Sequence, residues 1–224
     1  MTLLVKICGL NALAALDAAL DAGADLVGFV FFAPSPRHVD AATARALGEQ
    51  VQGRAQKVAL SVDASDDELA AAIAALAPDF LQLHGREPPE RVHDVRRRFG
   101  RPVIKALPIA EAADLAAIAR YDRVADRLLF DARAPQEATR PGGLGKSFDW
   151  RLLENLRCAV PFMLSGGLDA TNVTQALRIT GAPGVDVSSG VERRPGEKDL
   201  DKIRAFIHAA RGAAQQHRNV MSNA

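Results

Sequence analysis

The sequence predicts an α/β chain folded as a (β/α)8 barrel, and three observations support this prediction. Eight short apolar runs lie along the 224 residues, each separated from the next by about the length of a helix and two loops. Several runs are apolar almost throughout, which is typical of strands buried on both faces of a parallel sheet. The G-x-G-x-x-G motif that would favour an open, doubly wound sheet is absent from the sequence.

The predicted strands are rich in Val, Ile, Leu and Phe, as strand residues generally are. The second, which reads Leu-Val-Gly-Phe-Val-Phe from residue 26, illustrates why both faces are expected to be buried. The eight runs lie near residues 3–8, 26–32, 56–62, 80–83, 102–107, 127–131, 161–165 and 184–188. Eight parallel strands with outer helices predict a closed TIM barrel.

Helical segments are predicted between the strands. Leu13, Leu16 and Leu20 form one apolar face before a glycine. The segment 65–68, Ser-Asp-Asp-Glu, is a capping box that opens an Ala-rich helix ending near Pro78. Further helices are predicted to start near Asp40, Pro88, Glu111, Trp150, Asn172 and Lys198. These segments complete eight strand-then-helix units.

The chain is expected to form one domain. Residues 1–212 are assigned to the barrel, because no low-complexity linker divides them. The polar segment 213–224 contains Gln-Gln-His-Arg-Asn and is predicted to be a flexible C-terminal tail.

Composition excludes several classes of protein. The net charge of +1 and an aromatic content of 5% argue against a nucleic-acid partner. No apolar stretch approaches the ~20 residues needed to span a bilayer, and Lys6 interrupts the region where a signal peptide would need an apolar core. The two cysteines, Cys8 and Cys158, do not form a disulfide framework, and no metal-ligand spacing is present. We therefore expect a cytoplasmic protein without a membrane partner, as a monomer or a homodimer.

In such barrels the chemistry lies at the carboxyl ends of the strands. Two glycine turns, at 165–167 and 188–190, follow the last two predicted strands, where backbone N–H groups commonly bind phosphate. Tight turns without a ligand are the alternative for either one alone. The polar candidates at strand ends are Cys8, Arg37, Asp63, His84, Lys105, Asp131, Ser165, Asp186, Ser188 and Ser189.

Several blocks, in order along most of the chain, resemble the phosphoribosylanthranilate isomerase family. The blocks are Lys6-Ile7-Cys8-Gly9, Gly28-Phe29-Val30-Phe31, Ser35-Pro36-Arg37, Gln82-Leu83-His84-Gly85, Leu129-Phe130-Asp131, Gly142-Gly143-Leu144-Gly145-Lys146-Ser147-Phe148-Asp149-Trp150, Leu164-Ser165-Gly166-Gly167-Leu168 and Gly184-Val185-Asp186-Val187-Ser188-Ser189-Gly190-Val191-Glu192. The third strand, which ends in Ser61-Val62-Asp63, is less apolar than the family's usual one and leaves Asp63 without an assigned role.

The resemblance implies an Amadori rearrangement in tryptophan biosynthesis. N-(5-phospho-β-D-ribosyl)anthranilate would become 1-(2-carboxyphenylamino)-1-deoxy-D-ribulose 5-phosphate, without a cofactor. The reaction needs an acid to open the furanose ring and a base to take the C2′ proton. By resemblance Cys8 is the base and Asp131 the acid, and their strands are expected to face each other across the barrel mouth. Cys8 is expected to be solvent-reached and partly thiolate, Asp131 to be protonated, and Cys158 to be buried.

Substrate contacts are predicted at both ends of the ligand. Arg37 carries a guanidinium suited to the anthranilate carboxylate. His84 and Asp186 are substrate-binding candidates, although each could equally be a wall residue of the mouth. The loop from Gly142 to Lys146 could close over the substrate. The predicted phosphate-binding residues are Gly143, Ser165, Gly166, Gly167, Ser188, Ser189 and Gly190.

Two alternatives remain open at this point. The histidine-pathway aminoaldose isomerase uses similar chemistry, but that enzyme has an aspartate where this chain has Cys8. A non-catalytic phosphosugar-binding barrel would keep both glycine turns, yet it would tolerate the loss of Cys8 or Asp131, and both residues are present.

Overall fold

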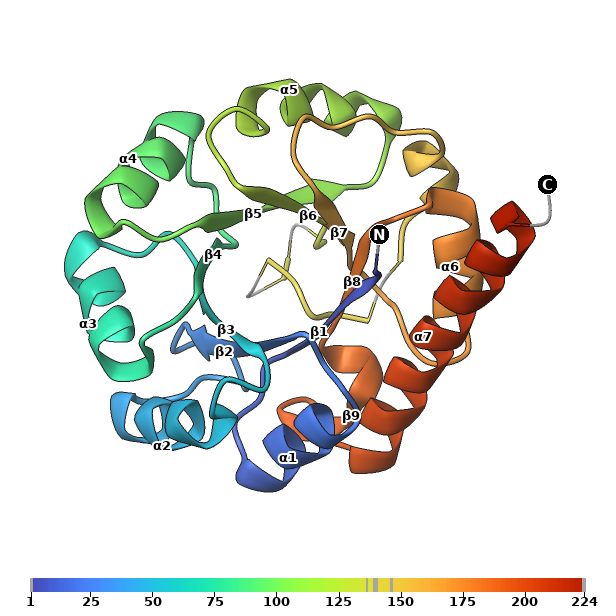
Figure 1. The fold of residues 1–224 in the computed structure, drawn as a ribbon. Coiled ribbons are helices and arrows are strands. Elements are labelled where there is room, and N and C mark those ends of the chain that lie inside the picture. Colours follow the sequence, from blue (N-terminus) through green and yellow to red (C-terminus); the bar gives the residue numbers. More distant parts are fainter. Residues whose placement is uncertain (1, 136, 139–140, 146, 223–224) are drawn as a thin grey trace.

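The chain forms a closed barrel of eight parallel strands surrounded by helices, as predicted (Figure 1). A computed structural model describes the backbone over residues 2–135, 137–138, 141–145 and 147–222, and the side chains within these ranges as far as residue 215. The strands pair in chain order, and β8 closes the barrel against β1. They are β1 (Leu4–Cys8), β2 (Leu26–Phe31), β3 (Gln56–Ser61), β4 (Phe80–Leu83), β5 (Val103–Ile109), β6 (Arg127–Ala132), β7 (Phe162–Leu164) and β8 (Gly184–Val187).

Local signals set where the helices begin and end. The carboxylate of Asp40 accepts a hydrogen bond from the backbone N–H of Thr43 at 2.7 Å and caps α2. The predicted capping box is present at α3, where Ser65 and Glu68 satisfy each other's backbone N–H groups. The α-helices are α1 (Leu13–Asp21), α2 (Ala41–Val51), α3 (Asp66–Leu76), α4 (Pro89–Phe99), α5 (Ile118–Tyr121), α6 (Val173–Thr180) and α7 (Leu200–Ser222).

The helical layer differs from the prediction after the fifth and sixth strands. After β5 the chain makes a 3₁₀ helix, η1 (Ala112–Ala117), which continues into the single turn of α5. After β6 the helix expected from Trp150 is a 3₁₀ turn, η2 (Trp150–Leu153), with Asp149 as its cap. The long connection before η2 carries prolines and glycines, which disfavour a continuous helix and leave chain free to cross the barrel mouth.

The end of the chain also departs from expectation. A small antiparallel hairpin, β9 (Glu192–Arg194) with β10 (Glu197–Lys198), lies between η3 (Ser189–Val191) and the last helix. Helix α7 then runs from Leu200 to Ser222. Among the helices of the described chain, none is long and apolar enough to cross a membrane.

Two apolar layers hold the barrel together. One large cluster lies between the strands and the helices, and it includes Val5, Ile7, Phe29 and Phe130. A second cluster fills the amino-terminal part of the barrel interior with Leu26, Val58, Phe80, Ile104, Ala106, Leu129 and Met163. Buried polar side chains of the barrel interior, among them Lys6, Gln82 and Asp186, lie above this second cluster, which places polar chemistry toward the carboxyl ends of the strands.

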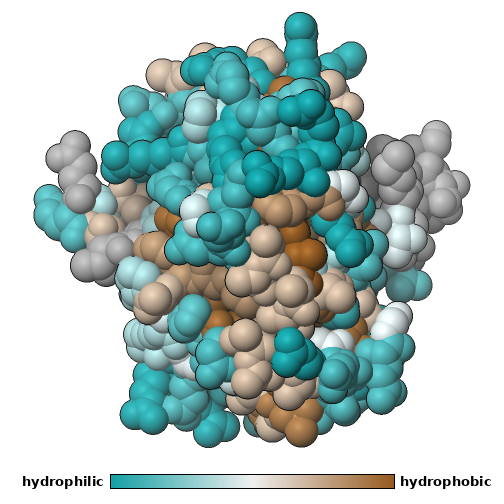
Figure 2. Space-filling view, turned by 90° about the vertical axis from the view of Figure 1, so that its left-hand side faces the viewer, coloured by the Kyte–Doolittle hydropathy of each residue, from teal (hydrophilic) through white to brown (hydrophobic). Residues whose placement is uncertain are grey.

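The outer face that carries α3 and α4 has an apolar area bordered by charged residues (Figure 2). On α3 the exposed positions include Ala70, Ala71 and Ala74, while Ile73 is half-buried. The apolar character of this helix surface therefore comes mostly from methyl groups rather than from large side chains.

A buried ion pair ties together the ends of three strands. The ammonium of Lys105, on β5, lies 2.7 Å from the Glu87 carboxylate, and both side chains are almost fully buried. The same carboxylate accepts hydrogen bonds from the backbone N–H groups of Asp63, after β3, and Gly85, after β4. The Tyr121 hydroxyl donates to the Glu87 carbonyl at 3.1 Å. This network fixes the strand ends from which the mouth of the barrel is built.

Breaking this pair should destabilise the protein strongly. Lys105→Met should lower the free energy of unfolding by about 3–5 kcal/mol, because the Glu87 carboxylate stays buried without its counter-charge. Denaturant unfolding measures the change. The matched control is Arg204→Met, which removes an exposed pair with Asp201 and should leave the midpoint unchanged. Equal small effects of both substitutions would contradict this interpretation.

Candidate active site

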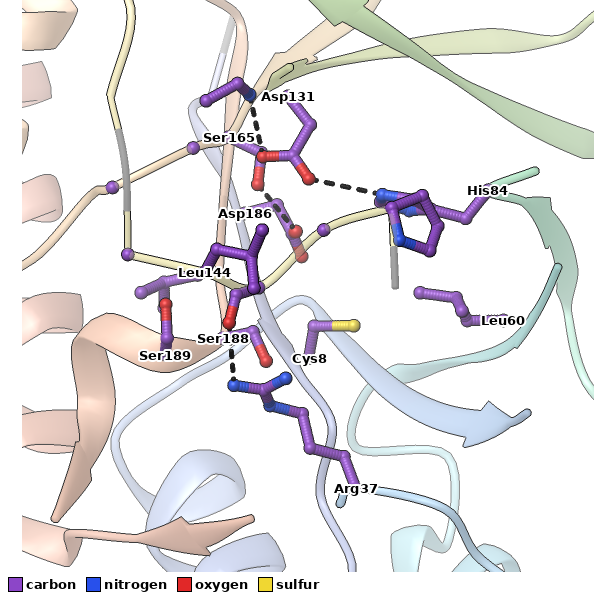
Figure 3. A pocket seen from close by; sticks show the side chains of 18 of the residues that line it. Cys8, Arg37, Leu60, His84, Asp131, Leu144, Ser165, Asp186, Ser188 and Ser189 are labelled. Carbon is purple, nitrogen blue, oxygen red and sulfur yellow. Dashed lines mark hydrogen bonds and ion pairs between the residues drawn. The ribbon is translucent and has the colours of Figure 1, made fainter. Parts of the chain in front are cut away.

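The carboxyl ends of the strands surround a pocket that opens to solvent (Figure 3). Two other polar candidates lie outside it. Lys105 pairs with Glu87, and Asp63, after β3, accepts a hydrogen bond from the Arg86 N–H in the loop after β4 at 2.7 Å. The pocket brings together all twelve predicted site residues, namely Cys8, Arg37, His84, Asp131, Gly143, Ser165, Gly166, Gly167, Asp186, Ser188, Ser189 and Gly190.

Cys8 is the last residue of β1 and lines this pocket, but it is less accessible than expected. Its exposed fraction is 3%, and burial raises the pKa of the thiol, against the opposing effect of the Lys6 charge. Cys158 lies in a loop and is the more exposed of the two thiols; burial and the charge of Asp122 also raise its pKa. The expectation of an open Cys8 and a buried Cys158 is therefore wrong. Cys8 lies at a strand end enclosed by the barrel wall, whereas Cys158 precedes β7 on the outside.

Lys6 lies beneath Cys8 inside the barrel and was missed as a site residue. Its ammonium is fully buried and lies 2.7 Å from the carboxylate of Asp186 on β8. The other oxygen of that carboxylate accepts from the Ser165 hydroxyl at 3.1 Å. Burial alone would lower the pKa of Lys6, but Asp186 and Cys8 outweigh it and raise the pKa to about 12. The sequence pattern could have identified Lys6, because alternate residues of a strand share one face and Lys6 lies two residues before Cys8.

Asp131, at the end of β6, is held by His84. The two side chains lie 3.2 Å apart, from Nε2 of His84 to Oδ2 of Asp131, and the other carboxylate oxygen accepts from the Ala132 N–H at 2.9 Å (Figure 3). On the far side of the imidazole, the buried amide nitrogen of Gln82 lies 3.0 Å from Nδ1. With Gln82 donating to Nδ1, the ring N–H is on Nε2 and points at Asp131. His84 thus orients a carboxyl group, and Gln82, also unpredicted, orients His84.

Arg37 is buried rather than a surface arginine. Its guanidinium makes two hydrogen bonds to the Glu192 carboxylate, at 2.7 and 2.8 Å, and a third to the Gly143 carbonyl at 3.1 Å. Lys198 donates to the same carboxylate at 2.9 Å and to the Ser188 carbonyl at 2.8 Å. Burial would raise the pKa of Glu192, but Arg37 and Lys198 together lower it. Glu192 and Lys198 were missed because the hairpin that positions them was not predicted.

The two glycine turns pack directly against each other at one side of the pocket. A side chain at Gly190 would overlap the carbonyl oxygen of Leu168, which directly follows the first turn. Close approach of the two backbones therefore requires glycine at this position. The arrangement lines one wall with backbone and with the hydroxyls of Ser165, Ser188 and Ser189, a polar surface of the kind that accepts a phosphate.

The connection after β6 crosses the mouth of the pocket. Its residues 141–145, Leu144 among them, line the site (Figure 3), and a Cβ added at Gly145 would lie 3.8 Å from the Ser189 hydroxyl oxygen. The Arg37 hydrogen bond to Gly143 ties this segment to the opposite wall. Lys146, the predicted end of the loop, lies outside the described residues. Across the described part of the chain, no three His, Cys, Asp or Glu side chains are grouped so that they could hold a metal ion.

Comparison with a family model agrees with this geometry. The model described as N-(5'phosphoribosyl)anthranilate (PRA) isomerase matches residues 5–209. Curated relatives of the same name include one from a Bradyrhizobium species, 62% identical over 215 residues, covering 96% of this chain and 98% of the relative. Another, from Nitrobacter winogradskyi, is 61% identical over 223 residues and covers 100% and 99% of the two chains.

Solved structures show the same resemblance. The phosphoribosyl anthranilate isomerase of Thermotoga maritima is 34% identical, with a TM-score of 0.85 over 94% of this chain and 100% of its own. A phosphoribosyl anthranilate isomerase in complex with reduced 1-(o-carboxyphenylamino)-1-deoxyribulose 5-phosphate is 31% identical, with a TM-score of 0.80 over 94% and 100%.

A large thiol reagent should reach Cys158 more easily than Cys8. A bulky maleimide should label Cys158 and leave Cys8 unmodified in the folded protein, because only Cys158 lies at the outer surface. Peptide mapping after short exposure identifies the labelled residue. Unfolding in urea is the control and should make both cysteines equally reactive. Preferential labelling of Cys8 in the folded protein would show that the mouth is wider than described.

Proposed function

The chain belongs to the phosphoribosylanthranilate isomerase family, and on that premise we propose how its pocket performs the family's reaction. Its activity is the isomerisation of N-(5′-phosphoribosyl)anthranilate in tryptophan biosynthesis, an aldose–ketose rearrangement. The observation that carries the proposal is the convergence of Cys8, from β1, and Asp131, from β6, on one pocket. The remaining steps assign roles to the residues around these two.

Asp131 is the general acid. Its proton passes to the furanose ring oxygen, the C1′–O bond breaks, and the anthranilate nitrogen supplies electrons to form an iminium. His84 holds Oδ2 of the Asp131 carboxyl group by a hydrogen bond, and the Ala132 N–H holds Oδ1. The acid is therefore oriented by two contacts before a ligand enters.

Cys8 is the general base. Its thiolate takes the proton from C2′, which is acidic because the adjacent iminium withdraws electrons. The electron pair of the C–H bond forms the C1′=C2′ bond of an enolamine, and the iminium returns to an amine. Tautomerisation of this enol to the C2′ ketone completes an internal oxidation of C2′ and reduction of C1′. No external electron acceptor is required for this balance.

The two ends of the substrate are bound on different walls. Arg37 offers its guanidinium to the anthranilate carboxylate, and Glu192 holds it in place for this. The turns at 165–167 and 188–190 bind the phosphate, together with Gly143 of the crossing segment, which lines the same pocket. His84 and Asp186 complete the walls near the acid and the base. The ligand is then fixed at both ends across the reacting carbons.

The alternatives from the sequence are less well supported. A histidine-pathway aminoaldose isomerase would have aspartate at position 8, whereas this chain has cysteine there and matches relatives of the other name at about 60% identity. A non-catalytic barrel gives no reason for an oriented carboxyl group at Asp131.

We propose a cytoplasmic location, because a phosphorylated substrate does not diffuse across a membrane. We also propose that the protein is a monomer or a homodimer. Light scattering on the purified protein tests the oligomeric state.

Removing either proton-transfer group should lower kcat while leaving binding intact. Cys8→Ala and Asp131→Asn should each reduce the rate by about 10²–10⁴-fold. The assay follows the loss of anthranilate-type fluorescence, and titration with a reduced product analogue measures binding. Cys158→Ala, the matched control at the second thiol, should retain full activity. Near-normal turnover by Cys8→Ala would assign the base to another group.

Substitutions at the two ends should affect different fragments of the substrate. Arg37→Ala should weaken binding of anthranilate by roughly 1.5–3 kcal/mol, the value of a hydrogen bond to a charged group. Gly190→Ala should weaken binding of ribose 5-phosphate, because the added methyl group displaces one glycine turn from the other. Calorimetric titration of each variant with each fragment tests this, with circular dichroism as the check on folding. Equal losses for both fragments in both variants would reject the division between the walls.

A further inference from the structure

A buried lysine lies beneath the proposed base, and the mechanism so far gives it no task. We propose that Lys6 is a positioning residue that holds Cys8 in its proton-accepting thiolate form, while Asp186 keeps the Lys6 ammonium in place. This inference rests on the proposed role of Cys8 as base, and it extends that role to a group that does not touch the substrate.

The geometry brings the ammonium and the thiol together. Lys6 and Cys8 are two residues apart on β1, so both point into the barrel. Opposite Cys8 in the register is Gly28 of β2. A Cβ placed on Gly28 would lie 2.9 Å from the Cys8 sulfur and 3.1 Å from Lys6 Nζ. Both groups therefore reach the same small space above the Gly28 backbone, which any larger residue would fill.

Asp186 holds the ammonium from the other side. It lies beside Lys6 in the β1–β8 register and is hydrogen-bonded to it at 2.7 Å. The Ser165 hydroxyl donates to its second oxygen, which fixes the carboxylate. A lysine this deeply buried is costly unless it is paired, and Asp186 supplies the pairing. The ammonium stays charged and cannot turn away from the thiol.

Buried cations around Cys8 oppose the effect of burial on its thiol. Lys6, Arg37 and Lys198 contribute three positive charges around Cys8, and Asp186 and Glu192 contribute two negative charges. Desolvation and the charge of Asp186 raise the pKa of the Cys8 thiol, while Lys6 and Lys198 lower it.

The charged and titratable groups that face Cys8 come from several elements. They are Lys6 on β1, Asp186 on β8, Lys198 on β10, Arg37 after β2, His84 after β4 and Asp131 on β6. Among the cations, Lys6 lies on the same strand face and shares the Gly28 space with the sulfur. It is therefore the cation whose removal should change Cys8 most.

The test measures the ionisation of Cys8 directly, in a Cys158→Ser background where Cys8 is the single thiol. The rate of alkylation by iodoacetamide, which is small enough to enter the pocket, is recorded against pH. Because only the thiolate reacts, the rate rises through the Cys8 pKa. With Lys6→Met the midpoint should move to a pH about 1 or more higher. The ascending limb of kcat should move in the same direction, with binding of the reduced product analogue retained.

A double variant tests whether Lys6 acts on the Cys8 thiol or only neutralises the charge of Asp186. Lys6→Met/Asp186→Asn removes both members of the pair, so no unpaired carboxylate remains to destabilise the barrel. The alkylation midpoint of the double variant should lie above that of Asp186→Asn alone, because these two proteins differ only at Lys6, while thermal stability recovers relative to Lys6→Met. If the folded double variant and Asp186→Asn have the same midpoint, the inference is overturned and Lys6 serves only to pair Asp186.

The two proposals fail in different ways. If Cys8 is not the base, Cys8→Ala keeps its activity whatever the alkylation curve shows. If Lys6 does not act on Cys8, the alkylation curve is unchanged even though Cys8→Ala is inactive. The thiol measurement needs no turnover, so it tests Lys6 independently of the assay.

Discussion

Closure of the barrel between β1 and β8 is the constraint on which the site depends. The pair between Lys6 and Asp186 spans 180 residues of sequence and forms only when the first and last strands align. The same seam places Cys8 in one pocket with Ser188 and the second glycine turn (Figure 3). Fold and chemistry are therefore coupled, because the register that buries the apolar strands also brings the acidic partner to the lysine.

The barrel interior is apolar at the amino-terminal ends of the strands and polar at their carboxyl-terminal ends. The amino-terminal part holds seven apolar side chains in close packing, whereas the carboxyl-terminal part holds buried ion pairs and the open pocket. Such pairs contribute little net stability, since desolvation offsets much of their attraction. The apolar layer supplies the stability, and the layer above it can carry charges whose arrangement suits proton transfer.

The strands and the main pocket residues could be predicted from the sequence, but the contacts between them could not. Apolar runs fix where strands lie, and strand ends in a parallel barrel must meet at one mouth, which is why Cys8 and Asp131 were found. Glu192 and Lys198 depend on a short hairpin with no apolar pattern of its own. The accessibility of Cys8 depends on how the barrel wall packs around it, and a single sequence does not encode that in any local pattern.

The seam between β1 and β8 has a further consequence for how the protein is made. Residues emerge from the ribosome in order, so β1 is complete long before β8 exists to pair with it. Until residues 184–187 are available, β1 and β7 present open sheet edges and Lys6 lacks its carboxylate. The nascent chain must be protected from edge-to-edge association over nearly its whole synthesis. Contacts of such long range also make the final closure intrinsically slow compared with helix formation.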